Sequence, residues 1–225
     1  MLLKSEWATR FARTCGKLRS ARRRSFAAGK LIYTAVPEGR CWIVTTGYVK
    51  LVDPSSDDSR FIRLILGRGA LFGDCPFKGS AFLGFISQPR ELALAHGRVD
   101  LIQLDCEELE TATRAQPELA AFMLESQTSR GQFLERRLHW QFKNPIRARM
   151  AAALRDLICY EGDRCKHGHT IDVRLTHQDL AELVGAARPV VSAELVRMRN
   201  EGLIEYTRSF FCVDDLAGLD RAAGM

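Results

Sequence analysis

The sequence predicts an α+β protein with an all-β N-terminal half, a long helix, and a smaller C-terminal part of mixed helices and strands. Three observations favour this class. Short runs rich in Val, Ile and Leu alternate with glycine-containing turns up to about residue 105. The stretch after them has the periodicity and composition of a helix. The last third holds two short helical patterns between two strand-like runs.

The first half should form strands, and the helix after it should carry a heptad seam. Turn residues separate strands that we expect near residues 31–34, 41–45, 48–52, 60–66, 92–95 and 99–104. The helical stretch that follows is broken by Pro117, and its second part spaces apolar side chains close to a heptad repeat. This seam consists of Leu119, Phe122, Ser126, Phe133 and Trp140. It indicates a dimer, and a lone helix packed on its own domain is the alternative.

Residues 175–206, LTHQDLAELVGAARPVVSAELVRMRNEGLIEY, predict two short helices joined by a tight corner. Thr176 is a good N-cap, and Gly185 can take the positive φ that ends a helix. Pro189 is tolerated only in a first turn, so a second helix starts near Arg188 and runs to about Asn200. Its inner side should consist of Val191, Leu195 and Met198, and its outer side of Arg188, Pro189, Ser192, Ala193, Val196 and Arg199.

Strand-like runs flank the two helices. GHTIDVRL precedes them and GLIEYTRSFFCVDD follows them, and both are rich in Ile, Val, Tyr or Phe. A small sheet behind two helices with a glycine corner is a winged helix-turn-helix, a motif that places its second helix in the major groove of DNA. A helical hairpin buried in a core is the alternative.

Three motifs, LTHQDLAELVG, the R…VS…L run of ARPVVSAEL, and GLIEY, resemble those of the cyclic-AMP receptor protein and fumarate/nitrate regulator (Crp/Fnr) family. Upstream, FAAGKLIYTAVPEGRCWIVTTGYVKLV and LILGRGALFGDCPF place glycines between short strands as that family's sensor β-roll does. The resemblance covers about residues 25–216. It implies a homodimeric transcription regulator that binds double-stranded DNA at a palindromic operator. The implied parts are a cyclic-nucleotide-binding-like β-roll with a basic helix at 1–115, a dimerisation helix at 116–143, and a winged helix-turn-helix domain at 144–225.

The outer side of the second helix should read the DNA. Arg188 could hold a guanine O6/N7 edge with two hydrogen bonds, worth ~1–3 kcal/mol of discrimination. Many family members carry an acidic residue just after this arginine and a second arginine in the next turn, where this chain has Pro189 and Ala193. We therefore expect an operator unlike the family's commonest one, with more A·T character at its inner positions. The expected base-facing residues are Arg188, Pro189, Ser192, Ala193 and Val196, and the phosphate contacts are Thr176, His177, Gln178, Arg199 and Arg208.

The effector is expected to differ from cyclic AMP. Cyclic-nucleotide-binding members hold the cyclic phosphate with FGE and a later R-S, and hold the base with polar residues of the dimer helix. This chain has FGD and PRE instead, and the carboxylate of Glu91 would repel a phosphate. The candidate pocket residues are Gly73, Asp74, Arg90, Glu91, Phe133 and Leu134. Arg90 could pair with another anionic ligand or with Asp74, and a constitutive DNA binder with a vestigial pocket remains open.

Metal or redox sensing is an alternative with weaker sequence support. Only Cys15 lies in the N-terminal region where the family's iron–sulfur branch needs a cysteine cluster. Cys41, Cys75 and Cys106 suit core filling, while a haem or nitric-oxide sensor with His96 or a cysteine as ligand stays open. The segment CYEGDRCKHGH suits a solvated loop, although its spacing leaves a metal or redox site as an alternative. The ligands of that site would be Cys159, Cys165, His167 and His169.

The composition suits two modest domains and a connector. The 225 residues are 46% hydrophobic, enough for separate cores. No apolar run reaches the ~18 residues that cross a bilayer, and no apolar stretch follows RRRSF as in an export signal. We therefore expect a cytoplasmic protein without a membrane partner. Seven cysteines without paired spacing fit free thiols. Without a Gly-x-Ser-x-Gly elbow or a phosphate loop, an enzyme is not expected.

The net charge of +6 is not carried by the predicted DNA-binding part. Residues 1–30 contain nine Lys or Arg against one Glu, a net +8, whereas residues 144–225 contain eleven against twelve Asp or Glu, a net −1. DNA affinity must then come from arginines placed locally beside the second helix. The basic N-terminal segment spaces Leu3, Trp7, Phe11 and Leu18 as a helix would, so we expect it to pack on the β-roll. A membrane or acidic partner, and a contact with DNA phosphates or RNA polymerase, are its alternatives.

Overall fold

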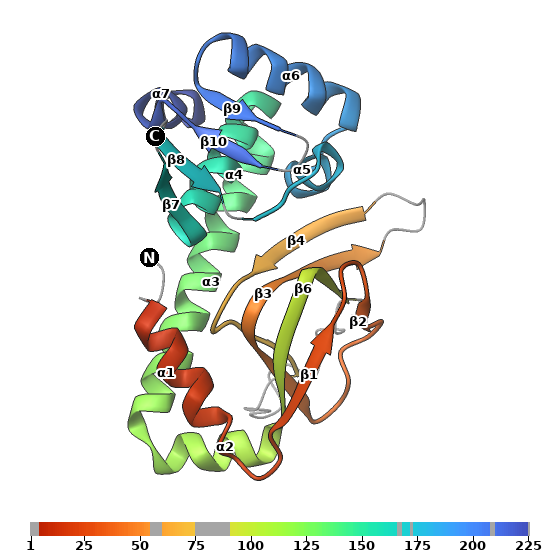
Figure 1. Cartoon of the computed structure of the whole chain (residues 1–225), viewed down its shortest axis with the longest axis vertical. Coiled ribbons are helices and arrows are strands. Elements are labelled where there is room, and N and C mark those ends of the chain that lie inside the picture. The colour runs from red at the N-terminus through yellow and green to blue at the C-terminus, as the bar shows by residue number, and fades with distance from the viewer. Residues whose placement is uncertain are drawn as a thin grey trace. The chain divides into compact units, whose positions relative to one another are not determined.

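The computed structural model describes residues 5–54, 60–74, 91–165, 168–171, 173–207 and 210–224, with the side chains of residues 5–7, 54, 143 and 159–165 outside that description. The chain divides into two compact units, residues 2–130 and 131–225, and each is described by itself. Their boundary falls inside one long helix, labelled α3 in Figure 1. No helix of the described residues is long and apolar enough to span a membrane.

The first unit is built on one antiparallel sheet of six strands (Figure 1). Its main path runs β1-β6-β3-β4, while β2 also pairs with β6 and β5 with β3. In β4, Ile62, Leu64 and Leu66 are buried and the residues between them are only partly covered, so one face of the strand meets the core. The strands are β1 (Arg22–Phe26), β2 (Leu31–Tyr33), β3 (Arg40–Pro54), β4 (Arg60–Leu66), β5 (Leu71–Gly73) and β6 (Leu92–Asp105).

Four of the strands expected in this unit form only two, because they join in pairs into longer continuous strands. The runs at 41–45 and 48–52 are both part of β3, and those at 92–95 and 99–104 are both part of β6. The glycine expected as a turn, Gly47, instead sits in an irregular stretch of the β3–β6 ladder with a φ of 76°. A Cβ there would lie 2.2 Å from the carbonyl oxygen of Arg98, so only glycine lets the two strands stay paired. The segments forming β1 and β5 were not expected as strands.

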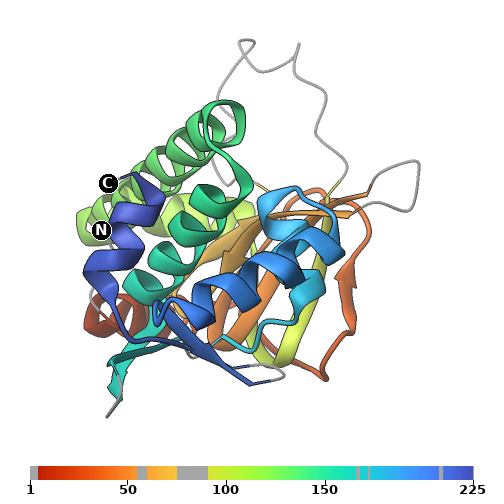
Figure 2. The same cartoon turned by 90° about the horizontal axis from the view of Figure 1, so that it is seen from above.

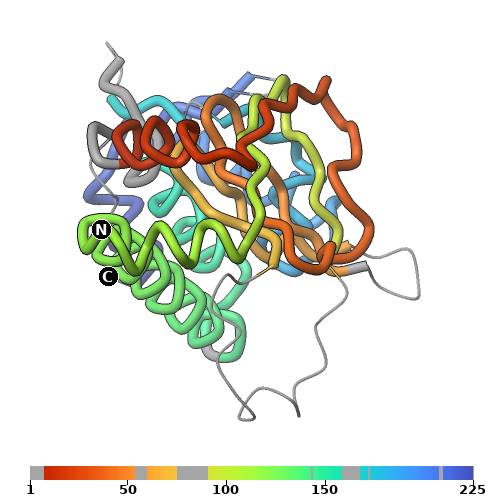
Figure 3. Tube along the Cα trace, turned by 90° about the horizontal axis from the view of Figure 1, so that it is seen from below, coloured from red at the N-terminus to blue at the C-terminus, as the bar shows by residue number. Residues whose placement is uncertain are grey.

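Three helices accompany this sheet, and they lie beside one another on one side of it (Figure 3). They are α1 (Ser5–Cys15), α2 (Cys106–Ala115) and the first half of α3 (Pro117–Lys143). The rings of Phe11 in α1 and Phe122 in α3 stack with centroids 4.0 Å apart. The basic segment therefore forms a helix with Phe11 in the core of the first unit, and Leu18, beyond the helix end, packs against that core. Leu3 and the side chain of Trp7 lie outside the described residues. Pro117 begins a helix, as its fixed φ allows.

The second unit combines four further helices with a small antiparallel sheet of order β7-β8-β10-β9. Its core includes Met150, Leu154, Leu175 and Phe211, all fully buried. The helices expected at the corner occur where the pattern placed them, and the C-terminal helix was not expected. The elements are α4 (Ile146–Glu161), β7 (Gly162–Cys165), β8 (Gly168–Ile171), α5 (His177–Val184), α6 (Arg188–Asn200), β9 (Ile204–Tyr206), β10 (Phe211–Val213) and α7 (Leu216–Ala223).

Candidate nucleic-acid interface

The corner between α5 and α6 is built from local backbone chemistry. The hydroxyl of Thr176 accepts from the backbone N–H of Asp179 at 3.0 Å, and the Asp179 carboxylate accepts from the N–H of Thr176 at 2.9 Å, which closes a capping box. Gly185 ends α5 with φ 64° and ψ 51°, a left-handed conformation that glycine adopts without strain. Pro189 lies in the first turn of α6. The capping box, the left-handed glycine and the proline together end α5 and start α6 in a new direction.

The two sides of α6 differ sharply in burial. Val191, Leu195 and Met198 are 0% exposed, as the helical period predicts. No ribbon of the unit passes in front of α6 in Figure 2. The opposite side is exposed at Arg188, Pro189, Ala193, Val196 and Arg199, while Ser192 is half-buried. The structure therefore brings all five residues expected to face bases onto one side of α6, a strip that is uncovered except at the half-buried Ser192.

A polar and aromatic cluster borders this strip. His177 Nδ1 lies 2.9 Å from the Ser192 hydroxyl, and its ring meets Tyr206 of β9 edge-on at 5.5 Å. The guanidinium of Arg199 lies 5.2 Å over the Tyr206 ring. Burial, and then the charge of Arg188, lower the pKa of His177. His177 and Arg199 are thus fixed beside Ser192, and sequence reasoning did not foresee this link.

Arginines of α4 hold α6 and the end of α5 in place. Glu194 is 9% exposed and accepts from Arg147 of α4 at 3.0 Å and from Arg197 at 3.3 Å. Arg147 also pairs with Glu201, just past the end of α6. Arg149 of α4 donates to the carbonyl of Val184 at 2.9 Å. The acid in the middle of α6 is therefore turned inward, away from the exposed side of the helix.

The wing adds an aromatic side chain that sequence reasoning missed. Phe210 precedes β10, is 41% exposed, and lies 5.1 Å from the guanidinium of Arg174. Arg174 itself is exposed. Thr176 and Gln178 are exposed at the start of α5. Arg208, the remaining expected phosphate contact, lies outside the described residues.

In the first unit, Glu91 is the centre of a buried charged cluster. It is 6% exposed, accepts from the Tyr33 hydroxyl, and forms an ion pair with Arg63 of β4. Arg63 also lies 3.6 Å from Asp53. Burial lowers the pKa of Arg130 of α3, and the charge of Glu91 opposes that shift. Burial and the hydrogen bond to Glu91 raise the pKa of Tyr33 far above its usual value.

The other expected pocket residues do not all join this cluster. The Asp74 carboxylate is buried and accepts from the backbone N–H of Gly39 at 2.7 Å. Gly73 has a φ of 99°, and a Cβ there would lie 2.6 Å from the Trp42 ring. Phe133 and Leu134 are half-buried in the part of α3 that belongs to the second unit. Arg90, and with it the expected pair with Asp74, lies outside the described residues.

Three cysteines of the first unit share its core. Cys15, Cys41 and Cys106 are free and buried, and burial raises the pKa of Cys15 to about 12. Cys41 and Cys106 lie in the hydrophobic core, as expected of cysteines that fill it. Cys75 lies outside the described residues. His96 lies in β6 opposite Tyr48. Cys212 of the second unit is a further free thiol.

The metal site suggested near residue 165 stays a prediction. His167, and the side chains of Cys159 and Cys165, lie outside the described part of the chain. His169 is half-buried in β8, opposite Val213 of β10. Among the described residues, no group of three or more His, Cys, Asp or Glu could hold a metal ion.

The long helix α3 carries uncovered apolar side chains. Leu124, Leu138 and Phe142 are 71%, 60% and 81% exposed. By contrast Leu119 and Phe122, the first two residues of the expected seam, are buried in the core of the first unit. The remaining seam residues, Ser126, Phe133 and Trp140, are half-buried.

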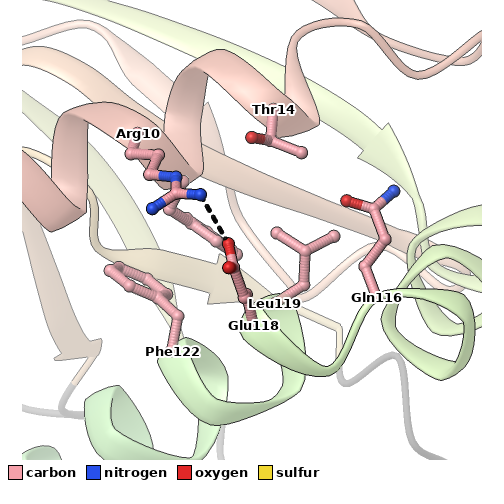
Figure 4. Close-up of a pocket in the computed structure, with 7 residues that line it drawn as sticks. Arg10, Thr14, Gln116, Glu118, Leu119 and Phe122 are labelled. Atoms are coloured by element: carbon pink, nitrogen blue, oxygen red, sulfur yellow. Dashed lines mark ion pairs between the residues drawn. The ribbon is translucent and has the colours of Figure 1, made fainter.

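A shallow pocket opens between α1 and the start of α3 (Figure 4). Phe11, Leu119 and Phe122 form its apolar lining. Arg10 and Glu118 form an exposed ion pair beside it, with 2.7 Å between nitrogen and oxygen. Of the expected effector residues that the structure describes, none lines it.

Comparison with known proteins agrees with this arrangement. Residues 148–222 match the family model of the Crp-like helix-turn-helix domain. The global nitrogen regulator of Nostoc sp. is 26% identical over 191 residues, 85% of this chain and 84% of that protein. A CooA mutant from Carboxydothermus hydrogenoformans superposes with a TM-score of 0.76 at 18% identity, covering 92% of this chain and 90% of that one. TTHB099 of Thermus thermophilus, a transcriptional regulator of the CRP family, gives 0.71 at 23% identity, with coverage of 90% and 97%.

Proposed function

We propose that this chain, a Crp/Fnr-type transcription regulator with a Crp-like helix-turn-helix domain, acts as a homodimer that binds a palindromic operator under the control of an effector. The observation that carries the proposal is the uncovered strip of α6, on which Arg188, Ser192 and Val196 lie together above a fully buried opposite side. A helix that is sealed on one side and exposed on the other, at a glycine corner, suits the major groove of DNA.

Electrostatics supports DNA binding through local placement. The second unit has no excess of positive charge in sequence, yet Arg188 and Arg199 are both exposed beside the strip. Glu194, the acidic residue within α6, forms ion pairs with Arg147 and Arg197. DNA phosphates can therefore contact arginines at the edge of α6. They are not repelled by an unpaired carboxylate in its middle turns.

The homodimer is supported by the apolar side chains that α3 leaves uncovered. Leu124 and Leu138 are fourteen residues apart, two heptads, with Gly131 midway between them. Apart from its chain neighbours and the backbone of its own helical turns, a Cβ on Gly131 would meet no atom of the described residues within 4 Å. A single helix-turn-helix reads only a few base pairs, and a two-fold dimer supplies the second half-site about one helical turn away. On this spacing and exposure, we propose a seam through Leu124, Gly131, Leu138 and Phe142.

The effector is proposed to be a small molecule other than cyclic AMP. At Glu91 a cyclic phosphate would meet a carboxylate that Tyr33 and Arg63 already hold in place. The rings of Tyr33, Trp42 and Phe72 are buried next to this cluster with centroids 5.2–6.1 Å apart, so its surroundings are apolar. A constitutive DNA binder is the second candidate, because the charges of the cluster satisfy one another.

As a partner of chromosomal DNA, the protein would act in the cytoplasm and contact RNA polymerase. Selection of duplexes from a random pool by the full-length protein tests DNA binding, and a symmetric consensus is expected. Native mass spectrometry of the freshly purified protein tests the dimer and any bound molecule in one measurement. A selection that enriches no sequence would overturn the proposal, and a monomer on the selected duplex would overturn its dimeric form. Full affinity without any added or bound molecule would favour the constitutive binder.

A further inference from the structure

We propose that α6 recognises the C5 methyl group of pyrimidines, so that 5-methylcytosine can replace thymine at the contacted positions of the operator. The proposal rests on the proposed DNA binding and names the chemical group that the helix recognises. It follows from three features of α6: an apolar row at its centre, charges confined to its margins, and a hydroxyl already engaged.

The centre of the uncovered strip is apolar. Pro189, Ala193 and Val196 follow one another at spacings of four and three residues, which places them on one line along a helix. All three are exposed, and Val196 is 42% exposed. Between Pro189 and Val196 this line offers no side-chain hydrogen-bond donor or acceptor to a base.

Polar groups lie to either side of this row. Arg188 and Arg199 flank it on one side and Arg197 on the other, as about 100° of rotation per residue requires. The Ser192 hydroxyl, the polar group next to the row, lies 2.9 Å from His177 Nδ1. Arg197 pairs with Glu194 at 3.3 Å. The arginines can contact phosphates or purine edges. The apolar row between them contacts the base edges on the floor of the major groove.

The major groove presents one kind of apolar group. Thymine carries a methyl at C5, cytosine carries hydrogen there, and 5-methylcytosine carries the same methyl as thymine. An apolar row gains from burying that methyl and cannot tell which pyrimidine bears it. Burial of one such group is worth roughly a fourfold change in affinity. A reader built this way responds to cytosine methylation, which hydrogen-bond readout of the same base pair would not.

The test uses the full-length protein and a duplex that it selects from a random pool. Replacing single thymines by uracil removes only the methyl, and we expect a loss of roughly fourfold at each contacted position and none elsewhere. Replacing the same T·A pair by C·G lowers affinity, and placing 5-methylcytosine there should recover roughly fourfold. Dissociation constants from fluorescence anisotropy measure each step.

Val196→Ala and Val190→Ala form a matched pair of variants. The two valines are 42% and 45% exposed, so neither substitution disturbs the core, but Val190 lies off the row. Val196→Ala should abolish the uracil penalty at one position, and Val190→Ala should leave every penalty in place. Affinity indifferent to uracil throughout, or equal behaviour of the two variants, would overturn the inference while leaving DNA binding intact. A protein that selects no duplex at all would overturn the proposed function as well.

Discussion

Arg188 begins α6 at the margin of the apolar row, exposed and one turn before Ser192. Its guanidinium can donate to both acceptors of a guanine edge, which an apolar row cannot do. We expect Arg188→Ala to weaken binding to the selected duplex by about 1–3 kcal/mol, which corresponds to roughly 5-fold to 150-fold in affinity, and to relax preference at one base pair. Anisotropy titrations against duplexes altered at each position measure both effects.

Arg221 serves as the matched control for this variant. It is an exposed arginine of the same unit, in α7, and pairs with Asp215 away from α6. Arg221→Ala should leave base preference unchanged. Equal preference profiles for the two variants would contradict a base-reading role for Arg188.

Glu91 illustrates a buried charge whose partners come from distant parts of the sequence. Its carboxylate holds Arg63 and Tyr33, so Glu91→Gln removes the closer counter-ion of Arg63 and leaves it only the 3.6 Å contact with Asp53. We expect this variant to lose about 3–5 kcal/mol of unfolding free energy. Glu118→Gln removes a carboxylate from the exposed pair with Arg10, and its cost should stay below about 1 kcal/mol. Urea unfolding of the two variants compares them, and equal losses would rule out an essential role for the cluster.

How far a residue's role could be predicted depended on how local its contacts are. The buried and exposed sides of α6 follow from a period of 3.6 residues, so Val191 and Val196 could be placed from sequence. Glu91 could be identified as an obstacle to a phosphate but not as the centre of a cluster. Its partners lie 58 and 28 residues away along the chain, and only the register of the strands brings them together. The His177–Ser192 contact escaped prediction for the same reason, because it needs the angle between two helices.

At the scale of elements, α4 carries a half-buried carboxylate that should make the stability of the second unit depend on pH. Burial raises the pKa of Asp156 to about 6, against the opposing charge of Arg136 on α3, 3.8 Å away. The folded state therefore holds this proton more tightly than the unfolded state does. The resulting stability is complete below about pH 4 and is lost as pH rises through about 6, by up to about 3 kcal/mol.

Asp156→Asn isolates that contribution, since an amide cannot ionise. The variant and the parent should be equally stable near pH 4, and the variant should gain as pH rises to 7. Unfolding in urea at pH 4, 5, 6 and 7 gives the difference at each pH. Asp214→Asn, an exposed change in the same unit, reports the effect of removing a surface charge. A constant difference between Asp156→Asn and the parent across this range would contradict the shifted ionisation.

Elements were predictable where apolar periodicity dominates and not where glycine or arginine dominates. β4 occupies the predicted residues, whereas β1 has the sequence RRRSF, which offers no alternation to detect. It becomes a strand because β6 supplies a full set of backbone partners, from Arg22 opposite Gln103 to Phe26 opposite Val99. Gly47 suggested a turn from sequence, and pairing of β3 with β6 overrides that preference.

For the whole molecule, the heptad pattern indicated a seam but could not say which apolar residues its own domain would take. Phe122 stacks on Phe11 in the core of its own chain and is not available to a partner. The exposed apolar side chains, Leu124, Leu138 and Phe142, lie further along α3. An isolated helix pattern contains no information on which of its apolar sides will be covered first. The partition became visible only once α1 was placed beside α3.

The dimer predicts a defined effect of charge on the uncovered side of α3. Leu138 and Phe142 are 60% and 81% exposed, so replacing both by Glu should not harm the fold of one chain. In a two-fold seam each new carboxylate meets apolar surface or its own copy, and we expect dissociation to the 25.3 kDa monomer. Affinity for the full palindrome should fall at least about a hundredfold, because the second half-site is no longer tethered, while affinity for a single half-site is unchanged.

Leu31→Glu supplies the control, since Leu31 is 43% exposed on β2, outside α3. It introduces the same charge in place of an exposed leucine and should leave mass and palindrome affinity as they were. Light scattering after size exclusion gives the mass, and anisotropy on full-site and half-site duplexes gives the affinities. If the α3 variant stayed dimeric, the seam would lie elsewhere. If it became monomeric yet bound the palindrome at full strength, one copy of α6 would suffice for recognition, and the symmetry argument for the operator would fail with it.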